Sequence, residues 1–451
     1  MSRRGSSWLF VSISMLISVT VARAAPQSGG AVLGQVQHPL ELPVYEGPPL
    51  TLRAARDEAL AKNPELVALR AQLRVTGERP AQERSLAPLM LETTIWQWPI
   101  NTLNPANTNM YMFMATQELP GRGKRDLRAA VSEKDVALAQ NDIESRARHV
   151  FNDVKQAYAE LFVSRKAIEI HLANVDILRQ FADISQAKYT TGRISQQDVL
   201  KAVVEVSRLH DDIIVLDQQA QIATAKLNTL LDRPTDAPIG PLGESREQTL
   251  LLPVADLQRQ ALERQPEIQG ARLAVERAEA ALAVARRDHK PDFSVQAGYL
   301  VMPQQTNSLL ARVGITWPDA PWSRGRIDAH VREASAEVET ATARQKSMES
   351  ALRFAVQEAY VRVKAAEERA ALLRTTILPQ SQQTLEVSRV AYQTDRLDFL
   401  ALLDNERTLL NAQLDYYRTL SDFDQALADL ERAVGTDLLP DMLRSAAREN
   451  R

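Results

Sequence analysis

One uninterrupted helix-forming stretch constrains this chain more than any other feature. From Asp126 to Lys188 there is neither glycine nor proline, and apolar residues recur mostly at helical spacing, with Arg165 as the main interruption. The apolar positions are Ala147, Phe151, Val154, Tyr158, Leu161, Ile168, Leu172, Val175 and Ala182. The pattern predicts a coiled-coil helix over 122–188. At about 1.5 Å per residue this helix is about 100 Å long, so it needs neighbours of similar length.

An internal repeat divides the chain into two halves that are offset by about 202 residues. The matching segments are 63–66 with 265–268, 154–158 with 356–360, and 189–193 with 392–396. Each half predicts a short helix, a medium helix, two strands, a very long helix, a tight turn and a medium-long helix. The first half places them at 51–62, 64–87, 89–98 with 109–117, 122–188, 190–195 and 196–232; the second at 254–263, 265–289, 292–302 with 309–317, 323–391, 393–397 and 398–434.

The lengths of these helices predict how they pair. In each half, the helix after the tight turn and the helix before the strands add up to nearly the length of the long helix. We therefore expect two shorter helices, stacked end to end, to flank one continuous helix. Pro80 and Pro379 each remove a backbone donor, so we expect local bends there.

The predicted strands alternate between apolar and polar residues. In 292–302, Phe293, Val295 and Tyr299 share one face, and Ser294 and Gln296 share the other. Strands of about 9–11 residues suit an outer membrane, with apolar side chains toward lipid and polar ones toward a wet lumen. Aromatic residues expected at the membrane interfaces lie near the strand ends: Trp96, Trp98, Tyr111 and Trp317. Small exposed hairpins on a soluble bundle would also give such short patterns.

Four strands cannot close a barrel, and an open edge in lipid leaves backbone groups unpaired. Two copies would give a minimal barrel filled by side chains, whereas three give twelve strands and a wider lumen. The predicted fold is mainly α with a small β part. It consists of a long coiled-coil α-barrel and a membrane β-barrel, with four strands per protomer, twelve in a trimer, and an internal two-fold repeat.

The N-terminus predicts export from the cytoplasm. Arg3 and Arg4 precede an apolar run from Trp8 to Val21, and Ala22-Arg23-Ala24 follows as a cleavage site. The predicted domains are a signal peptide (1–24), a Pro/Gly-rich segment (25–50), a first repeat (51–232), a linker forming an equatorial region (233–253), a second repeat (254–435) and a tail (436–451). The chain has no cysteine, so neither disulfides nor a lipoprotein anchor are expected.

Composition and motifs argue against several functions. The net charge is −3, and removing Arg3, Arg4 and Arg23 with the signal lowers it to −6, so nucleic acid is not expected as a partner. No Gly-x-Ser-x-Gly, phosphate-binding loop or His-based metal motif is present, so neither catalysis nor a cofactor is predicted. The alternating Met110, Met112 and Met114 could bind a soft metal, but such residues more often face lipid or fill a barrel wall.

Three segments resemble the TolC-type outer-membrane factor family: 117–125 (Gln-Glu-Leu-Pro-Gly-Arg-Gly-Lys-Arg), 63–66 (Asn-Pro-Glu-Leu), and 189–193 (Tyr-Thr-Thr-Gly-Arg) with Asp-Val-Leu at 198–200. The resemblance covers about 51–434, and 117–125 is similar to members that serve heavy-metal exporters. It implies a homotrimeric duct in outer-membrane lipid with a large periplasmic part. It also implies a periplasmic adaptor (membrane fusion protein) and an inner-membrane pump as partners. The chain departs from the family at Asp395, where the second turn usually has glycine, so we expect a distorted turn or a left-handed Asp395.

The resemblance also implies a periplasmic aperture where the helix ends converge. By resemblance, Asp198 and Asp404 match positions that line the closed aperture, Tyr392 and Arg396 resemble residues that latch neighbouring coils, and Arg193 offsets the acidic charge. These residues could instead be solvated positions at helix ends, where Asp198 is favourable. The predicted function is passive export, and the alternative is a soluble periplasmic coiled-coil scaffold or adaptor. The sequence leaves the exported substrate open between a metal ion and a drug or other small molecule.

Overall fold

The computed structural model describes residues 45–98, 100, 104, 107–243, 249–303 and 305–438. The predicted signal peptide, residues 25–44 of the segment 25–50 and most of the tail 436–451 lie outside these residues. Within the described part of the chain, no helix combines the length and the apolar character that a membrane crossing would require.

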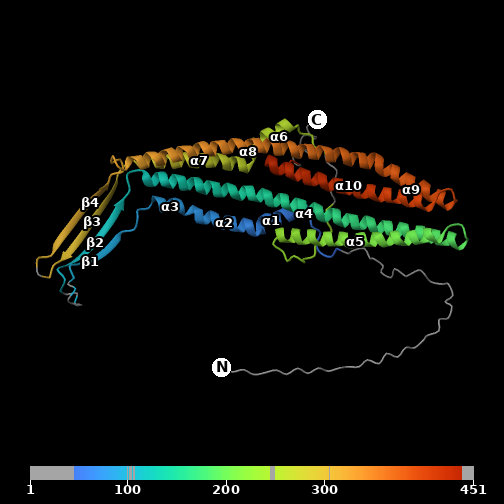
Figure 1. Cartoon of the computed structure of the whole chain (residues 1–451), viewed down its shortest axis with the longest axis horizontal. Helices are drawn as coiled ribbons and strands as arrows, with labels where there is room; N and C mark the ends of the chain where they lie inside the picture. The colour runs from blue at the N-terminus through green and yellow to red at the C-terminus, as the bar shows by residue number, and fades with distance from the viewer. Residues whose placement is uncertain are drawn as a thin grey trace, which may run out of the picture. The chain divides into compact units, whose positions relative to one another are not determined.

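Helices dominate the two halves, which follow the same order of elements (Figure 1). The first half comprises α1 (Leu52–Lys62), α2 (Pro64–Gly77), α3 (Arg79–Arg84), β1 (Met90–Trp96), β2 (Met110–Leu119), α4 (Lys124–Thr190) and α5 (Gln196–Leu230). The second comprises α6 (Val254–Arg264), α7 (Pro266–Arg287), β3 (Asp292–Val301), β4 (Ser308–Thr316), α8 (Arg324–Leu372), the π-helical turn η2 (Leu373–Ile377), α9 (Leu378–Gln393) and α10 (Phe399–Val434). The mainly α class with a small β part is confirmed.

The repeated Pro-Glu motif has a structural cause in both halves. Asn63 Oδ1 accepts a hydrogen bond from the backbone N–H of Glu65 at 3.1 Å and so caps α2. Gln265 caps α7 in the same way by accepting from the N–H of Glu267. Proline occupies the first helical position in both cases, where its missing donor is not needed.

The two predicted bends differ in form. The single helix expected over 64–87 is wrong, because α2 ends at Gly77 and α3 begins at Arg79 and ends at Arg84, with Pro80 in its first turn. The helix expected over 323–391 keeps a helical backbone from α8 into α9 but contains the π-helical turn η2 directly before α9. Pro379 lies in the first turn of α9, where its missing N–H and its ring are accommodated.

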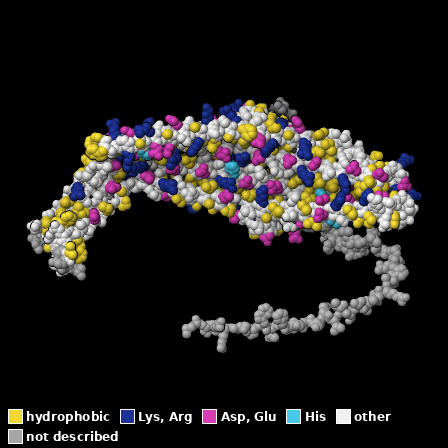
Figure 2. Space-filling model, viewed as in Figure 1, with side chains coloured by type: hydrophobic (Ala, Val, Ile, Leu, Met, Phe, Trp, Pro, Cys, Tyr) yellow, Lys and Arg dark blue, Asp and Glu magenta, His cyan; other side chains and the backbone are white. Residues whose placement is uncertain are grey.

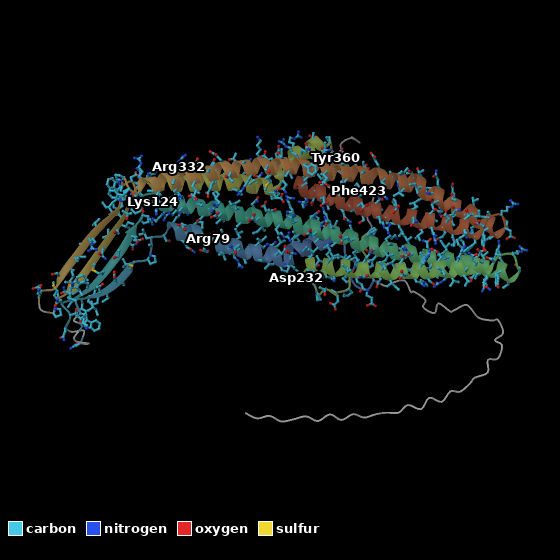
Figure 3. All side chains as sticks on the ribbon, in the orientation of Figure 1. Arg79, Lys124, Asp232, Arg332, Tyr360 and Phe423 are labelled. Atoms are coloured by element: carbon cyan, nitrogen blue, oxygen red, sulfur yellow. The ribbon has the colours of Figure 1, made fainter. Side chains whose placement is uncertain are left out.

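The long helices are flanked as the lengths predicted. Helix α4 contacts α1, α2 and α3 along one part and α5 along another, while α8 contacts α7 and α10 (Figure 1). One core region joins α4, α5 and α10, and a second joins α6, α8 and α10. Figure 3 marks two residues of the second region, Tyr360 on α8 and Phe423 on α10.

Arg165 interrupts the apolar seam of α4 because it holds the segment that connects the two halves. Its guanidinium donates to the carbonyl oxygens of Ile239 at 2.8 Å and Gly240 at 2.7 Å, and it stacks 3.8 Å from the centre of the Tyr45 ring. Arg165 therefore attaches the connecting segment to α4.

The four strands form one antiparallel sheet in the order β1-β2-β3-β4, at the end of the helices where α4 and α8 begin (Figure 1). The central pair β2–β3 comes from different halves of the chain, with Phe113 opposite Tyr299 and Met114 opposite Gly298. Alternate residues share a face. One face carries exposed apolar side chains from all four strands: Leu91, Phe113, Phe293, Val295, Tyr299, Leu309, Val313 and Ile315.

Candidate functional site

The two tip turns, 191–195 between α4 and α5 and 394–398 between α9 and α10, share one backbone conformation. The N–H of Arg193 donates to the carbonyl oxygen of Lys188 at 3.0 Å, and that of Arg396 donates to Ala391 at 2.9 Å. Each turn needs one left-handed residue, which is Gly192 (φ 72°) in the first and Asp395 (φ 59°) in the second. The expected left-handed Asp395 is therefore observed.

Asp395 ties the second turn to the first. Lys188, at the end of α4, lies 2.5 Å from Asp395 Oδ1, and Arg193 NH1 lies 3.2 Å from Oδ2. The hydrogen bond from Lys188, together with the charges of Lys188 and Arg193, lowers the pKa of Asp395. The two turns are thus fastened by charged groups of the same chain, which we call the tip clasp.

Tyr392 belongs to the same cluster. Its ring is 2 % exposed, its hydroxyl lies 2.9 Å from Ser185 Oγ, and its carbonyl oxygen accepts from Lys188 Nζ. The ammonium of Lys188 also lies 4.3 Å from the centre of the ring. Burial raises the pKa of the phenol. Tyr392 therefore stabilises the two tip turns through contacts within one chain.

The predicted aperture residues divide between two hollows. Asp198, Arg193 and Tyr392 line a hollow of about 540 Å³ at the tip. Asp404 lies instead in a groove of about 720 Å³ between α5 and α10, beside the exposed Leu200 and Leu400. Among the described residues the Asp404 carboxylate forms no ion pair, and Arg396 is exposed and lines neither hollow. The residues named from the sequence thus form two groups, and Lys188 and Ser185, which hold the first, were missed.

A buried acidic residue lies behind the groove. Glu406 on α10 is 1 % exposed, and its Oε1 has no hydrogen-bond partner among the described residues. Burial raises its pKa to about 7, and the nearby charge of Glu205 adds to this while Arg407 opposes it. Glu205 on α5 is itself held by Arg407 through contacts of 3.1 and 2.5 Å. The groove between α5 and α10 is therefore fixed by one ion pair beside a carboxyl that titrates near neutrality.

The family follows from comparison with known sequences. The sequence model of the outer membrane efflux protein family matches residues 55–233 and 257–436, which is most of the chain. The chain belongs to the outer membrane efflux protein family. The two matched segments coincide with the two structural halves described above.

Known members extend the comparison. The efflux protein is similar to the cobalt-zinc-cadmium resistance protein CzcC of Cupriavidus metallidurans, with 24% identity over 86% of this chain and 90% of that protein. Its fold is similar to the outer membrane protein VceC of Vibrio cholerae, with a TM-score of 0.71, 18% identity, and coverage of 85% of this chain and 96% of that chain. It is also similar to CusC, with a TM-score of 0.74, 16% identity, and coverage of 85% and 92%. The fold is that of outer-membrane efflux channels.

The four aromatic residues named from the sequence lie at both ends of the sheet of the efflux protein. Trp96, Trp98 and Tyr111 lie where β1 and β2 meet, far from the helices, and Trp317 follows β4 at the helical end. Trp322, which the sequence analysis missed, is 86 % exposed near Trp317 and could have been found from its place just before the long helix.

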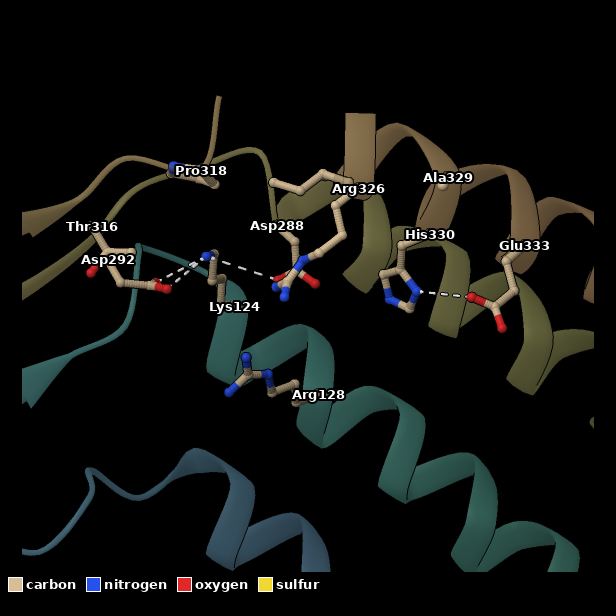
Figure 4. A pocket seen from close by; sticks show the side chains of 11 residues that line it. Lys124, Arg128, Asp288, Asp292, Thr316, Pro318, Arg326, Ala329, His330 and Glu333 are labelled. Carbon is tan, nitrogen blue, oxygen red and sulfur yellow. Dashed lines mark hydrogen bonds and ion pairs between the residues drawn. The ribbon is translucent and has the colours of Figure 1, made fainter. Parts of the chain in front are cut away.

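A polar hollow of about 650 Å³ joins the sheet to the helices (Figure 4). Lys124, 3 % exposed at the start of α4, donates to Asp292 at the start of β3 at 3.0 Å and lies 3.9 Å from Asp288. The Gly121 N–H also donates to Asp292, at 2.7 Å. These contacts fix the direction in which the sheet leaves the helices, and the family-like segment 117–125 provides two of the partners.

Proposed function

We propose that this efflux protein is one protomer of a homotrimeric outer-membrane duct, with the sheet in lipid and the helices in the periplasm. The observation that carries the proposal is the sheet itself. Among the described residues, its outer strands β1 and β4 each have one neighbouring strand, and one of its faces exposes apolar side chains such as Leu309 (85 %) and Val313 (71 %). Figure 2 shows hydrophobic side chains gathered on the sheet, whereas charges of both signs are mixed over the helices.

Lipid makes assembly necessary for such a sheet. Unpaired strand edges in hydrocarbon leave backbone groups without partners, at several kcal/mol each. Pairing β4 of one copy with β1 of the next satisfies both edges, and three copies give twelve strands around a water-filled lumen. Trp96, Trp98 and Tyr111 would then form one interfacial girdle, and Trp317 with Trp322 the other.

The helices offer surfaces for the same assembly. Exposed apolar residues lie along α5, α8 and α9: Leu200, Val204, Ile214, Val215, Ile222, Phe354, Val361, Leu372, Val387 and Val390. A monomer would leave these side chains in water, whereas neighbouring protomers, or a periplasmic adaptor at the tip, can cover them. Family membership supports this channel and not the soluble scaffold or adaptor.

The partners follow from the passive nature of the duct. The chain has no recognisable energy-coupling motif, so an inner-membrane pump with its adaptor supplies the driving force. The similarity to a cobalt-zinc-cadmium resistance protein favours a heavy-metal pump as that partner and a metal ion as the cargo.

Fractionation tests the duct directly. The mature protein should be found in the outer membrane, run as a detergent-resistant trimer and conduct ions in a planar bilayer. A water-soluble periplasmic monomer would overturn the proposal.

The tip is the proposed aperture. Asp404 forms no ion pair with another described residue, and three copies of its carboxylate around a narrow opening would attract cations. Asp404→Ala should therefore weaken the block of single-channel conductance by trivalent cations. Asp217→Ala, on α5 away from the tip, is the matched control, and equal block in wild type and Asp404→Ala would exclude Asp404 from the aperture.

A further inference from the structure

Four methionines lie on the polar face of the sheet, opposite the exposed apolar face. Register places Met110, Met112 and Met114 of β2 against Trp96, Thr94 and Glu92 of β1. Met90 pairs with Thr116 and is therefore the diagonal neighbour of Met114 on the same face. The chain has nine methionines, so this small area holds nearly half of them.

The neighbours of these methionines are both polar and apolar. The same face carries Glu92, the hydrogen bond from Gln296 to Thr116 at 2.9 Å, and Arg312. Trp96 lies opposite Met110, and Leu300 lies opposite Met112. If the methionines served only to contact lipid, they would belong on the opposite face with Phe113 and Tyr299. Their place on the opposite face separates them from the residues that are proposed to contact lipid.

The fold makes room for one of the sulfur atoms. Gly298 of β3 lies opposite Met114, and a Cβ at that position would overlap Met114 Sδ. The thioether therefore lies over the bare backbone of β3 instead of packing against a side chain. Met110, Met112 and Met114 are all half-buried, so their side chains are held by neighbours and still reachable from solvent.

We propose that Met110, Met112 and Met114, with Met90 beside them, form a thioether site for a soft monovalent cation of the Cu(I) or Ag(I) class. Thioethers are soft, neutral ligands that select such cations over hard or borderline divalent ones. The Glu92 carboxylate opposite Met114 supplies a negative charge next to the neutral sulfurs. Among the described residues, no group of three or more His, Cys, Asp and Glu could hold a divalent ion instead.

The inference rests on the proposed function, because closing the sheet with its apolar face toward lipid turns the methionine face into the lumen. The site then lies on the path of the cargo. Methionine side chains are flexible and these lie at an open surface, so binding to their sulfur atoms is reversible. The site would therefore bind cations transiently as they pass through the duct.

Silver binding tests the site on the full-length mature trimer in detergent, because Ag(I) is a redox-stable probe of this chemistry. Calorimetric titration should show saturable binding that excess Zn²⁺ does not displace. Replacing Met110, Met112 and Met114 together by Leu, which conserves volume, should abolish it. Met348→Leu on α8, at another exposed methionine, is the matched control and should bind silver as wild type does.

Protection from oxidation tests the same site without any substitution. Ag(I) should slow the conversion of Met110, Met112 and Met114 to sulfoxide by hydrogen peroxide, mapped by peptide mass, and leave Met348 unprotected. Equal oxidation with and without silver, or unchanged binding in the triple variant, would overturn the site. A trimer that conducts ions but does not bind silver would leave the duct standing, whereas a protein that is absent from the outer membrane would remove both.

Discussion

The two ends of this molecule are stabilised in opposite ways. At the helical tip, the turns are joined by groups of one chain, since Lys188, Arg193 and Asp395 pair with one another and Tyr392 is buried. At the sheet, the outer strands have unpaired edges and the apolar face is exposed. The contacts at the tip therefore lie within one chain, whereas under the proposed function the sheet depends on other copies and on lipid.

The largest effect is expected from a charge on the apolar face of the sheet, because it tests whether that face needs an apolar environment. Val313→Arg places a guanidinium near the middle of β4 on the proposed lipid face, which costs about 2–4 kcal/mol per protomer at the bilayer midplane. We expect the trimer to disappear from the outer membrane, as measured on seminative gels.

Thr94→Arg, in the middle of β1 on the opposite face, is the matched control and should assemble, because that face already carries Arg312. If both variants assembled equally, the two faces would not differ in environment.

The buried Glu406 should make the helical end sensitive to pH. Its pKa of about 7 in the fold lies above the ordinary value of 4.5, so the folded chain binds the extra proton. The proton on Glu406 contributes to the free energy of unfolding. This contribution is complete below pH 4.5 and is lost as the pH rises through 7, and it amounts to at most about 3 kcal/mol. Wild type should thus melt at a lower temperature at pH 8 than at pH 5.5, in detergent.

Glu406→Gln removes the titrating group and keeps its size, so it should flatten this dependence. Glu386→Gln, an exposed carboxylate on α9, should leave it intact. A Glu406→Gln variant with the wild-type pH dependence would assign the effect to another group.

Loosening the tip clasp should have a smaller effect on stability and a clear one on conductance. Lys188→Met removes the ammonium that contacts Asp395 and the Tyr392 carbonyl oxygen while keeping an apolar side chain. The expected loss of stability is about 1–2 kcal/mol. We expect the proposed trimer to conduct more in a planar bilayer.

Lys201→Met is the matched control for this change. Lys201 forms no ion pair with the described residues and lines the neighbouring groove. Equal conductance of the two variants would show that the clasp does not restrain the aperture.

The smallest expected effects compare the two tip turns. Gly192→Ala meets no atom within 4 Å, so its destabilisation, about 1 kcal/mol, comes from the left-handed backbone alone. Asp395→Gly relieves the same conformation but loses two ion pairs, so its net effect on the melting temperature should be close to zero. A large loss at Asp395→Gly would mean that the ion pairs contribute more than the backbone conformation costs.

The sequence by itself determined most of the elements and their repetition, although not the division of 64–87 into α2 and α3. Periodic apolar residues without glycine or proline define α4, and alternation defines the strand faces, because both signals are local and depend only on backbone geometry. The left-handed Asp395 could also be predicted, since the first turn has glycine at the equivalent position.

Only the tertiary structure decided which side chains meet. Lys188 and Asp395 are 207 residues apart, and Glu406 looks like any helical glutamate until the packing of the helices buries it. The pairing of β2 with β3, and with it the place of Met114 over Gly298, also arises from packing between the halves. Such contacts depend on how distant segments pack against one another, and local periodicity carries no information about that.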